Sequence, residues 1–203
     1  RSIDAVRGAG LDTMTIAAYG SRGSNPASVE SFIITDDLVG TLSLEDLGER
    51  WVKDPQAMPP VFKRALIERV ATIARTMHGA GINHRDFYLA HFLMRDSDAA
   101  TNNADGPLYL IDLHRSQVRG QVPRRWRIKD LGGLYFSTAR FGMTRRDLLR
   151  FIRTYSGLPL RQALADDSTW TAVRREAEKI YRRYFEVEPE LPLQFNEHPG
   201  KDI

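Results

Sequence analysis

Two aspartates have the residue type and placement that phosphoryl transfer requires. Asp86 completes the tripeptide His84-Arg85-Asp86 directly after a long predicted helix, and Asp112 ends an apolar strand further along the chain. One carboxylate must accept or orient the proton of the attacking hydroxyl, and a second must hold the Mg²⁺ that bridges the phosphates. Asp86 and its neighbour Arg85 are therefore candidate catalytic residues, and Asp112 is a candidate metal ligand.

The structural alternative for both aspartates is capping, with Asp86 closing a turn and Asp112 starting a helix. A lone His-Arg-Asp tripeptide arises often by chance. The surrounding order is more specific: a helix, the tripeptide, a short strand, a polar turn and then a strand that ends in Asp112. This order favours the catalytic hypothesis.

The elements that must position these aspartates follow from residue periodicity and from Gly and Pro. Apolar residues recur at spacings of three and four over 60–78, which predicts the clearest helix. Other helices are predicted over 1–8, 43–51, 129–138, 144–155, 160–164 and 168–185. A hairpin is predicted from 14–19 and 31–36 around a turn at 20–26, a strand over 108–113, loops or turns over 82–93 and 96–106, and a loose tail over 189–203. A few strands followed mostly by helices indicate the α+β class.

The composition excludes cysteine chemistry but does not select one class of ligand. The chain has no cysteine, so disulfides, thiolate metal sites and cysteine nucleophiles are excluded. The net charge of +3 and the pI of about 9.3 suit a nucleotide, a nucleic acid, a phosphorylated sugar or a membrane surface. No apolar run is long enough to predict a transmembrane helix.

The strings around both aspartates resemble the protein-kinase fold, and within it the lipopolysaccharide core kinases of the Kdo/heptose kinase (WaaP-type) family. The resemblance is closest to the heptose I kinases and covers nearly the whole chain. It is carried by residues 31–35, 84–93, 111–115, 124–131, 134–137 and 158–161. It implies the remainder of an N-lobe and its hinge in residues 1–38, and a helical C-lobe with the catalytic loop in residues 39–203.

Within this resemblance, Asp86 matches the catalytic-loop aspartate, and ATP and Mg²⁺ are the implied cofactors. His91 stands where protein kinases carry a metal-binding Asn. Mg²⁺ prefers oxygen ligands, so His91 either contacts the metal weakly or hydrogen-bonds a phosphate or the loop backbone. Asp112 matches the Asp of Asp-Phe-Gly, but Leu113 and His114 follow it, so the Phe-based switch is absent. Asp130 matches a buried aspartate that braces the loop, or is a plain carboxylate opening a helix.

The resemblance also implies a nucleotide site after the second predicted strand. There the backbone of Asp36 and Leu38 would hydrogen-bond adenine, Thr35 would guard the back pocket, and Leu93 would form the apolar floor. The alternative for Asp36 and Asp37 is an exposed loop, which is compatible because hinge contacts are made by the backbone.

Cations without an intervening acid follow Asp112. Such a run is usually a solvated face or a nucleic-acid patch. The acceptor of the resembled family carries carboxylates and phosphates, however, and arginine binds both bidentately. The candidate acceptor-binding residues are His114, Arg115, Arg119, Arg124, Arg125 and Lys129. Trp126 either stacks on a sugar or has a core or membrane-interface role. The short segment between Asp112 and Asp130 lacks an Ala-Pro-Glu motif, which argues for a small-molecule or glycolipid acceptor.

The implied partners are the lipopolysaccharide inner-core glycolipid and an acyl carrier protein, with no nucleic acid. The implied location is the cytoplasmic side of the inner membrane of a Gram-negative bacterium, with peripheral attachment through basic residues. The Gly-rich loop, strand Lys and helix Glu of kinases are not visible in the sequence. The sequence also opens in the middle of a helical pattern, so we expect a fragment of a longer kinase rather than a degenerate one.

Two alternatives to a heptose kinase stay open at this point. The first keeps the enzyme and changes the acceptor, giving a Kdo kinase or a protein kinase. The second is a pseudokinase or basic scaffold that binds an acidic partner.

Overall fold

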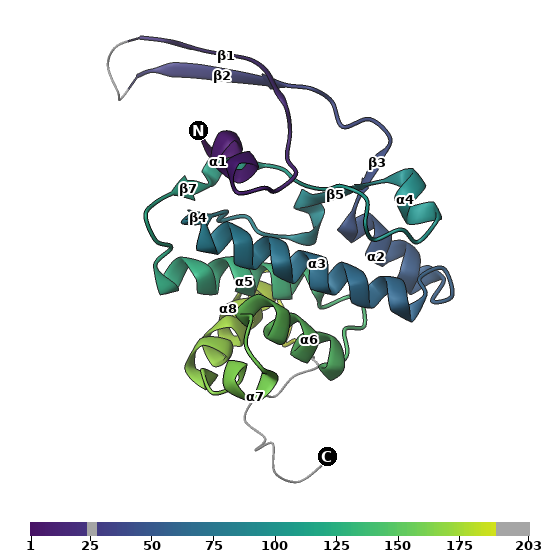
Figure 1. Ribbon diagram of the computed structural model, residues 1–203. Helices are drawn as coiled ribbons and strands as arrows, with labels where there is room; N and C mark the ends of the chain where they lie inside the picture. Colours follow the sequence, from purple (N-terminus) through teal and green to yellow (C-terminus); the bar gives the residue numbers. More distant parts are fainter. Residues whose placement is uncertain (24–27, 190–203) are drawn as a thin grey trace.

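The computed structural model describes residues 1–23 and 28–189 (Figure 1). The helices are α1 (Ser2–Gly8), α2 (Leu44–Lys53), α3 (Pro60–Gly79), α4 (Asp96–Ala100), α5 (Arg124–Thr138), α6 (Arg145–Ser156), α7 (Leu160–Ala163) and α8 (Asp167–Phe185). The strands are β1 (Ile16–Arg22), β2 (Glu30–Thr35), β3 (Thr41–Ser43), β4 (Ile82–Asn83), β5 (Phe92–Arg95), β6 (Leu108–Leu110) and β7 (Gln117–Val118). Two 3₁₀ turns, η1 (Leu89–His91) and η2 (Leu113–Arg115), complete the mixed architecture of helices and small antiparallel sheets.

Helix α3 is the longest helix and runs through the middle of the molecule (Figure 1). Its apolar stripe is buried along its length, from Phe62 through Val70 to Met77. Helix α6 packs on α3, and α5 packs on α8. Pro60 occupies the first turn, where a missing N–H costs nothing. The predicted helix over 60–78 is confirmed. The loop that carries Asp86 follows shortly after its end.

Two small sheets hold the segments on either side of that loop. In the order β3-β5-β6, Phe92 of β5 pairs with Leu110 of β6, so the strand that precedes Asp112 is buried against the strand that follows the loop. Strand β4 pairs with β7. Gly81 makes this pairing possible, because its φ is +76° and a Cβ there would overlap the carbonyl oxygen of Arg119.

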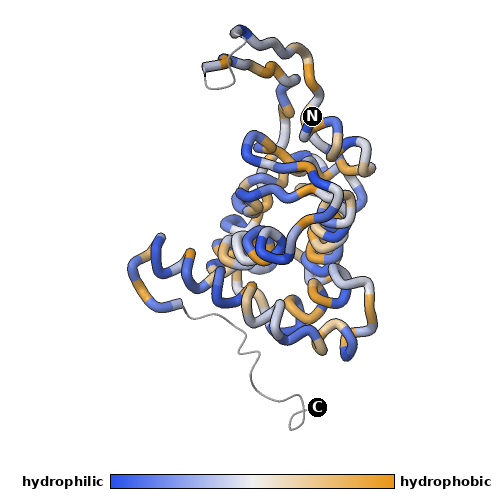
Figure 2. The backbone as a smooth tube through the Cα atoms, turned by 90° about the vertical axis from the view of Figure 1, so that its left-hand side faces the viewer, coloured by the Kyte–Doolittle hydropathy of each residue, from blue (hydrophilic) through white to orange (hydrophobic). Residues whose placement is uncertain are grey.

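The β1–β2 hairpin projects from the rest of the chain (Figures 1 and 2). The strands pair antiparallel, as predicted, with Tyr19 opposite Ile33 and Gly20 opposite Phe32. Both faces are exposed: Tyr19 is 79% exposed and Phe32 is 58% exposed. Hydrophobic residues, orange in Figure 2, therefore continue along the projecting hairpin and are not confined to the core.

Several sequence-based boundaries differ from the structure. The predicted loop over 82–93 contains β4, η1 and the start of β5, and the predicted turn over 96–106 contains α4. Helix α5 begins at Arg124 rather than at Lys129, because the basic run before Lys129 is itself helical. Residues 24–26 of the predicted turn and residues 190–203 of the predicted tail lie outside the described residues.

Candidate active site

Asp86 and Asp112 are joined through the imidazole of His91. Because the Asp86 carbonyl can only accept, His91 Nδ1–H donates to it, at 2.6 Å. On the other side of the ring, Nε2 lies 3.3 Å from Asp112 Oδ2. His91 ends η1 and the next residue begins β5, which pairs with the strand before Asp112. The structure therefore brings together the predicted catalytic aspartate and both predicted metal residues.

The backbone at Asp112 turns sharply, and that turn directs the next residues back to the carboxylates. Asp112 has φ 59° and ψ 49°, a left-handed conformation that non-glycine residues seldom adopt. The turn η2 follows directly. His114 Nδ1 contacts Asp112 Oδ1, and an Nη of Arg115 donates to Asp86 Oδ1 at 2.6 Å. Two predicted acceptor-binding residues thus contact the two aspartates themselves.

Asp130 holds the backbone of the loop that carries Asp86 through buried hydrogen bonds. It is fully buried inside α5, where Oδ2 accepts from the amide of His84 at 2.9 Å and Oδ1 accepts from the amide of Arg85 at 2.7 Å. His78 Nε2–H donates to the same carboxylate at 3.1 Å, and its Nδ1 accepts from the Tyr155 hydroxyl at 2.9 Å. Burial raises the pKa of Tyr155 to about 12, so this hydroxyl stays a donor. Asp130 is a brace of the loop, and the alternative of a carboxylate opening a helix is wrong.

His84 connects the loop that carries Asp86 to the residue just before Asp112. Its side chain is buried, and Nε2–H donates to the Ile111 carbonyl at 2.9 Å. Its ring stacks on His91 with centroids 5.7 Å apart. Burial lowers the pKa of His84, against a smaller opposing effect of the Ile111 carbonyl. A neutral imidazole therefore links the two carboxylate loops.

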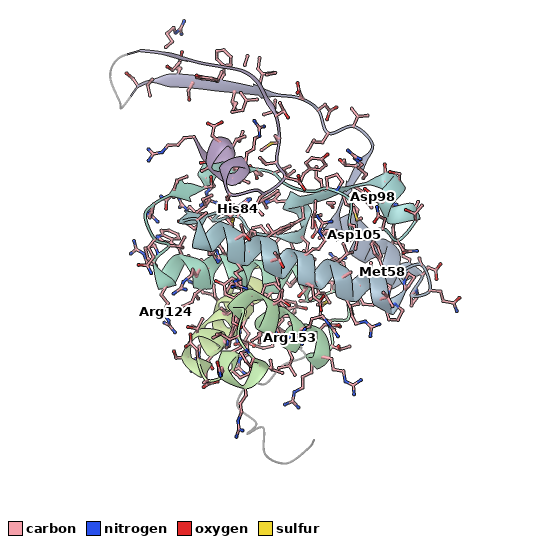
Figure 3. All side chains as sticks on the ribbon, in the orientation of Figure 1. Met58, His84, Asp98, Asp105, Arg124 and Arg153 are labelled. Carbon is pink, nitrogen blue, oxygen red and sulfur yellow. The ribbon has the colours of Figure 1, made fainter. Side chains whose placement is uncertain are left out.

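The predicted acceptor-binding cations do not act as one patch. Arg115 pairs with Asp86, as described above. Arg124, at the start of α5 (Figure 3), instead hydrogen-bonds the hydroxyls of Ser168 and Thr169 at the start of α8. Its guanidinium therefore links α5 to α8.

The other cations gather around the indole of Trp126. The guanidinium carbons of Arg119 and Arg125 lie 5.8 and 5.3 Å from the ring centre, and Lys129 Nζ lies 5.2 Å from it. Arg85, the neighbour of Asp86 in the sequence, joins them at 5.1 Å. Within residues 1–23 and 28–189, none of these four cations forms an ion pair with a carboxylate. The Trp126 cluster, made of Trp126, Arg85, Arg119, Arg125 and Lys129, is thus a concentration of uncompensated positive charge next to Asp86.

Three of the four residues predicted to bind nucleotide lie at the end of β2 and in the connection from β2 to β3, and Leu93 lies in β5. Thr35 ends β2, and the amide of Asp36 donates to Thr15 at 2.9 Å. The Leu38 carbonyl accepts from Thr41 Oγ1 at 2.6 Å. Leu93, in β5, pairs across to β3. The amide of Leu38 makes no backbone hydrogen bond in the described part of the chain, which is compatible with a role in ligand binding.

The sequence-based search missed Tyr88 as a site residue. Burial, and then the charge of Asp86, raises the pKa of the Tyr88 phenol, so the hydroxyl stays protonated near that carboxylate. Gly133 on α5 makes room for the ring, since a Cβ there would lie 3.1 Å from Tyr88 Cε1. The only signal in the sequence was its place two residues after Asp86.

An apolar cavity of about 130 Å³ lies in the helical part of the chain, and neither Asp86 nor Asp112 lines it. Its walls come from α2, α3, α5, α6 and α8 and from the connection between α5 and α6, and include Leu47, Trp51, Phe141, Phe151 and Trp170. Lys63, also in the lining, pairs with Asp147 at 2.7 Å and stands 4.0 Å above the Trp51 ring. The cavity is chemically distinct from the carboxylate site.

This pair of loop carboxylates, braced by a buried aspartate on a mainly helical scaffold, is an arrangement typical of kinases. Residues 1–155 match the lipopolysaccharide kinase (Kdo/WaaP) family, and the chain belongs to that family.

Individual relatives agree with this assignment. The chain is 50% identical over 176 residues to the lipopolysaccharide core heptose(I) kinase WaaP of Pseudomonas aeruginosa, and 46% identical over 175 residues to that of Escherichia coli K12. Each match covers 86% of this chain and 65% of the relative, so the chain spans just under two thirds of the length of these relatives. A solved structure of WaaP in complex with acyl carrier protein is similar, with a TM-score of 0.81 and 48% identity over 89% of this chain and 74% of that one.

Proposed function

We propose that this protein transfers phosphate from ATP to a heptose hydroxyl in the inner core of lipopolysaccharide. The observation that carries the proposal is the contact of His91 with both Asp86 and Asp112, which brings the two candidate carboxylates to one site. The heptose(I) kinase names of the relatives supply the substrate class. In the same proposal, residues 39–189 form the helical C-lobe of a protein-kinase-like fold, and residues 1–38 contribute the end of the N-lobe and its hinge.

In the proposed reaction, the acceptor hydroxyl oxygen attacks the γ-phosphorus of ATP. The bond between that phosphorus and the β–γ bridging oxygen breaks, and ADP leaves with the electron pair. The hydroxyl proton passes to the Asp86 carboxylate, whose Oδ2 makes no hydrogen bond within the described part of the chain. Catalysis of this kind rests mainly on positioning and on charge stabilisation.

Mg²⁺ fits the donors at Asp112 and His91. Among the described residues, no group of three or more His, Cys, Asp or Glu side chains could hold a metal ion. A full protein cage is not required, because Mg²⁺ in kinase sites is held by one or two protein carboxylates together with water and substrate phosphates. Asp112 would be the main ligand, with His91 beside it, and the ion would neutralise charge on the phosphates. On the nucleotide side, Thr35, Asp36, Leu38 and Leu93 would contact adenine.

The Trp126 cluster supplies the support for an anionic acceptor. Its four cations have no carboxylate partner in the described residues, and Arg85 connects the cluster to Asp86. Phosphate and carboxylate groups of a glycolipid would offset this charge, and arginine recognises both. A glycolipid acceptor also implies peripheral association with the cytoplasmic face of the inner membrane of a Gram-negative bacterium. Among the described helices none is long and apolar enough to cross a bilayer.

An acyl carrier protein is the proposed protein partner. A similar solved structure contains WaaP together with that partner. The 130 Å³ cavity offers a second reason, since its apolar walls could receive an alkyl chain carried by such a partner. The expected result is co-purification of the full-length protein with acyl carrier protein, lost when Leu47→Trp fills the cavity.

The test of the enzymatic proposal compares acceptors. Full-length protein, ATP and Mg²⁺ are supplied with unphosphorylated inner-core lipopolysaccharide, with a Kdo acceptor that lacks heptose, or with a protein substrate. Phosphate on heptose alone supports the proposal, and phosphate on Kdo or protein supports the corresponding alternative. Asp86→Asn is expected to lower the rate of transfer by at least about 10²-fold. A wild-type protein that transfers nothing while still binding an acidic partner would instead indicate a pseudokinase scaffold.

A further inference from the structure

Arg115 and Asp86 form an ion pair, whereas the sequence predicted Arg115 only as an acceptor-binding residue. One Nη of Arg115 donates to Asp86 Oδ1 at 2.6 Å, a short charge-assisted contact. The Asp86 side chain is 15% exposed and that of Arg115 is 48% exposed. Guanidinium has five N–H donors, and this contact uses one of them. Arg115 therefore anchors on the proposed base while most of its donors remain accessible.

The backbone fixes where those donors lie. Arg115 ends the turn η2, which begins directly after Asp112, and the amide of Ser116 closes the turn on the Leu113 carbonyl at 3.1 Å. The guanidinium thus belongs to the segment of one carboxylate and contacts the other. In the proposed reaction, a phosphoryl group moving from a nucleotide at Asp112 to a hydroxyl at Asp86 would pass next to this guanidinium.

Arg115 is the cation best placed to offset the negative charge at this site. Two carboxylates and a triphosphate concentrate negative charge, and the loop from Phe87 to Ala90 contains no cation. Arg85, adjacent to Asp86, is directed elsewhere: its φ is +79°, and its guanidinium lies over the Trp126 ring. A cation aimed at the transferring phosphoryl group is a recurring part of such sites.

We propose that Arg115 is a catalytic residue rather than an acceptor-binding one. One of its N–H groups holds the Asp86 carboxylate, and the others donate to the equatorial oxygens of the phosphoryl group as it passes from ADP to the acceptor oxygen. This assignment rests on the proposed kinase function and gives one residue of that site a different task. The contacts to phosphoryl oxygens strengthen in the transition state, so they act on kcat.

The experiment measures kcat and the acceptor KM for phosphate transfer to unphosphorylated inner-core lipopolysaccharide. Arg115→Gln is expected to lower kcat by about 10²–10³-fold, the loss typical of one transition-state donor, with the acceptor KM nearly unchanged. Arg115→Lys, which keeps the charge, should recover part of that loss. The matched control is Arg153→Gln, an exposed cation on α6 away from the site, whose kcat should equal that of the wild type (Figure 3).

A double variant gives a second readout. In Asp86→Asn, adding Arg115→Gln should reduce kcat by much less than it does in the wild type, because the two residues act together. A normal kcat with a raised acceptor KM in Arg115→Gln would overturn the assignment and return Arg115 to acceptor binding. That outcome leaves the kinase proposal intact, whereas absence of transfer by the wild type would overturn both.

Discussion

The loop that carries Asp86 and the β1–β2 hairpin are held in opposite ways. The loop buries the ring of Phe87 in the core, and its backbone is fixed by buried polar contacts from Asp130, with His84 linking it to Ile111. The hairpin carries many apolar side chains, but residues such as Phe32 and Ile33 are more than half exposed. Its ladder hydrogen bonds are its main internal support. Burial, not hydrophobicity of the sequence, decides which region is rigid.

The difference predicts that the largest loss follows removal of the brace. Asp130→Ala leaves the amides of His84 and Arg85 and the imidazole of His78 without their buried acceptor. The free energy of unfolding should fall by about 3–5 kcal/mol, and phosphate transfer should be lost at temperatures where the variant is still folded. Urea unfolding measures the first effect. A variant with wild-type stability would show that the buried contacts do not hold the loop.

Next in size is Gly81→Ala, at the start of the same loop. The residue has φ +76°, and the added methyl group would overlap the Arg119 carbonyl oxygen, so the β4–β7 pairing must shift. We expect a loss of about 2–3 kcal/mol in a thermal or urea melt, within the range for strained backbone positions. Gly79→Ala is the matched control, because a Cβ there meets nothing within 4 Å. Equal losses in the two variants would contradict this account.

His84 predicts a smaller effect that depends on pH. Burial lowers its pKa from the usual 6.5, so the unfolded chain binds a proton there before the folded chain does. Stability from this group is full above pH 6.5 and is lost as the pH falls towards the folded pKa, by at most about 1.4 kcal/mol per pH unit. Urea unfolding of the wild type and of His84→Gln at several pH values measures this pH dependence of the unfolding free energy. A variant with the same pH slope as the wild type would exclude His84 as the cause.

The smallest effect is expected in the hairpin, where Phe32→Ser should change the unfolding free energy by less than about 0.5 kcal/mol. The ring is already in water, so little burial is lost. Amide hydrogen exchange gives the matching kinetic test, with fast exchange expected across β1 and β2 and slow exchange at His84 and Arg85. Slow exchange in the hairpin would mean that something covers it in solution.

Sequence patterns predicted the elements that depend on one-dimensional periodicity. The apolar stripe of α3 and the helix predicted over 43–51, which is α2, are examples, since their signals lie within the element itself. Helix α5 was predicted to start five residues late, at Lys129. Its first turns carry mostly cations, and such a run has no apolar period to detect.

The site was predictable in its residues but not in its contacts. Asp86 and Asp112 stand out by type and spacing, and His91 was implied by the family resemblance; the three do come together. The pairing of Arg115 with Asp86 depends on a left-handed turn at Asp112. No neighbouring glycine in the sequence indicates this turn. Contacts that arise from such a turn, or from a buried partner distant in sequence, require the folded chain.

The division of labour between the two carboxylates is the central claim, and a Mg²⁺ titration of phosphate transfer tests it most directly. Asp112→Asn should raise the Mg²⁺ concentration needed for half-maximal transfer, since it weakens the main metal ligand. Asp86→Asn should reduce the maximal rate by at least about 10²-fold with the Mg²⁺ requirement unchanged. An Asp86→Asn enzyme that needs more Mg²⁺, together with an Asp112→Asn enzyme of unchanged requirement, would contradict the assignment of base to Asp86 and of metal to Asp112.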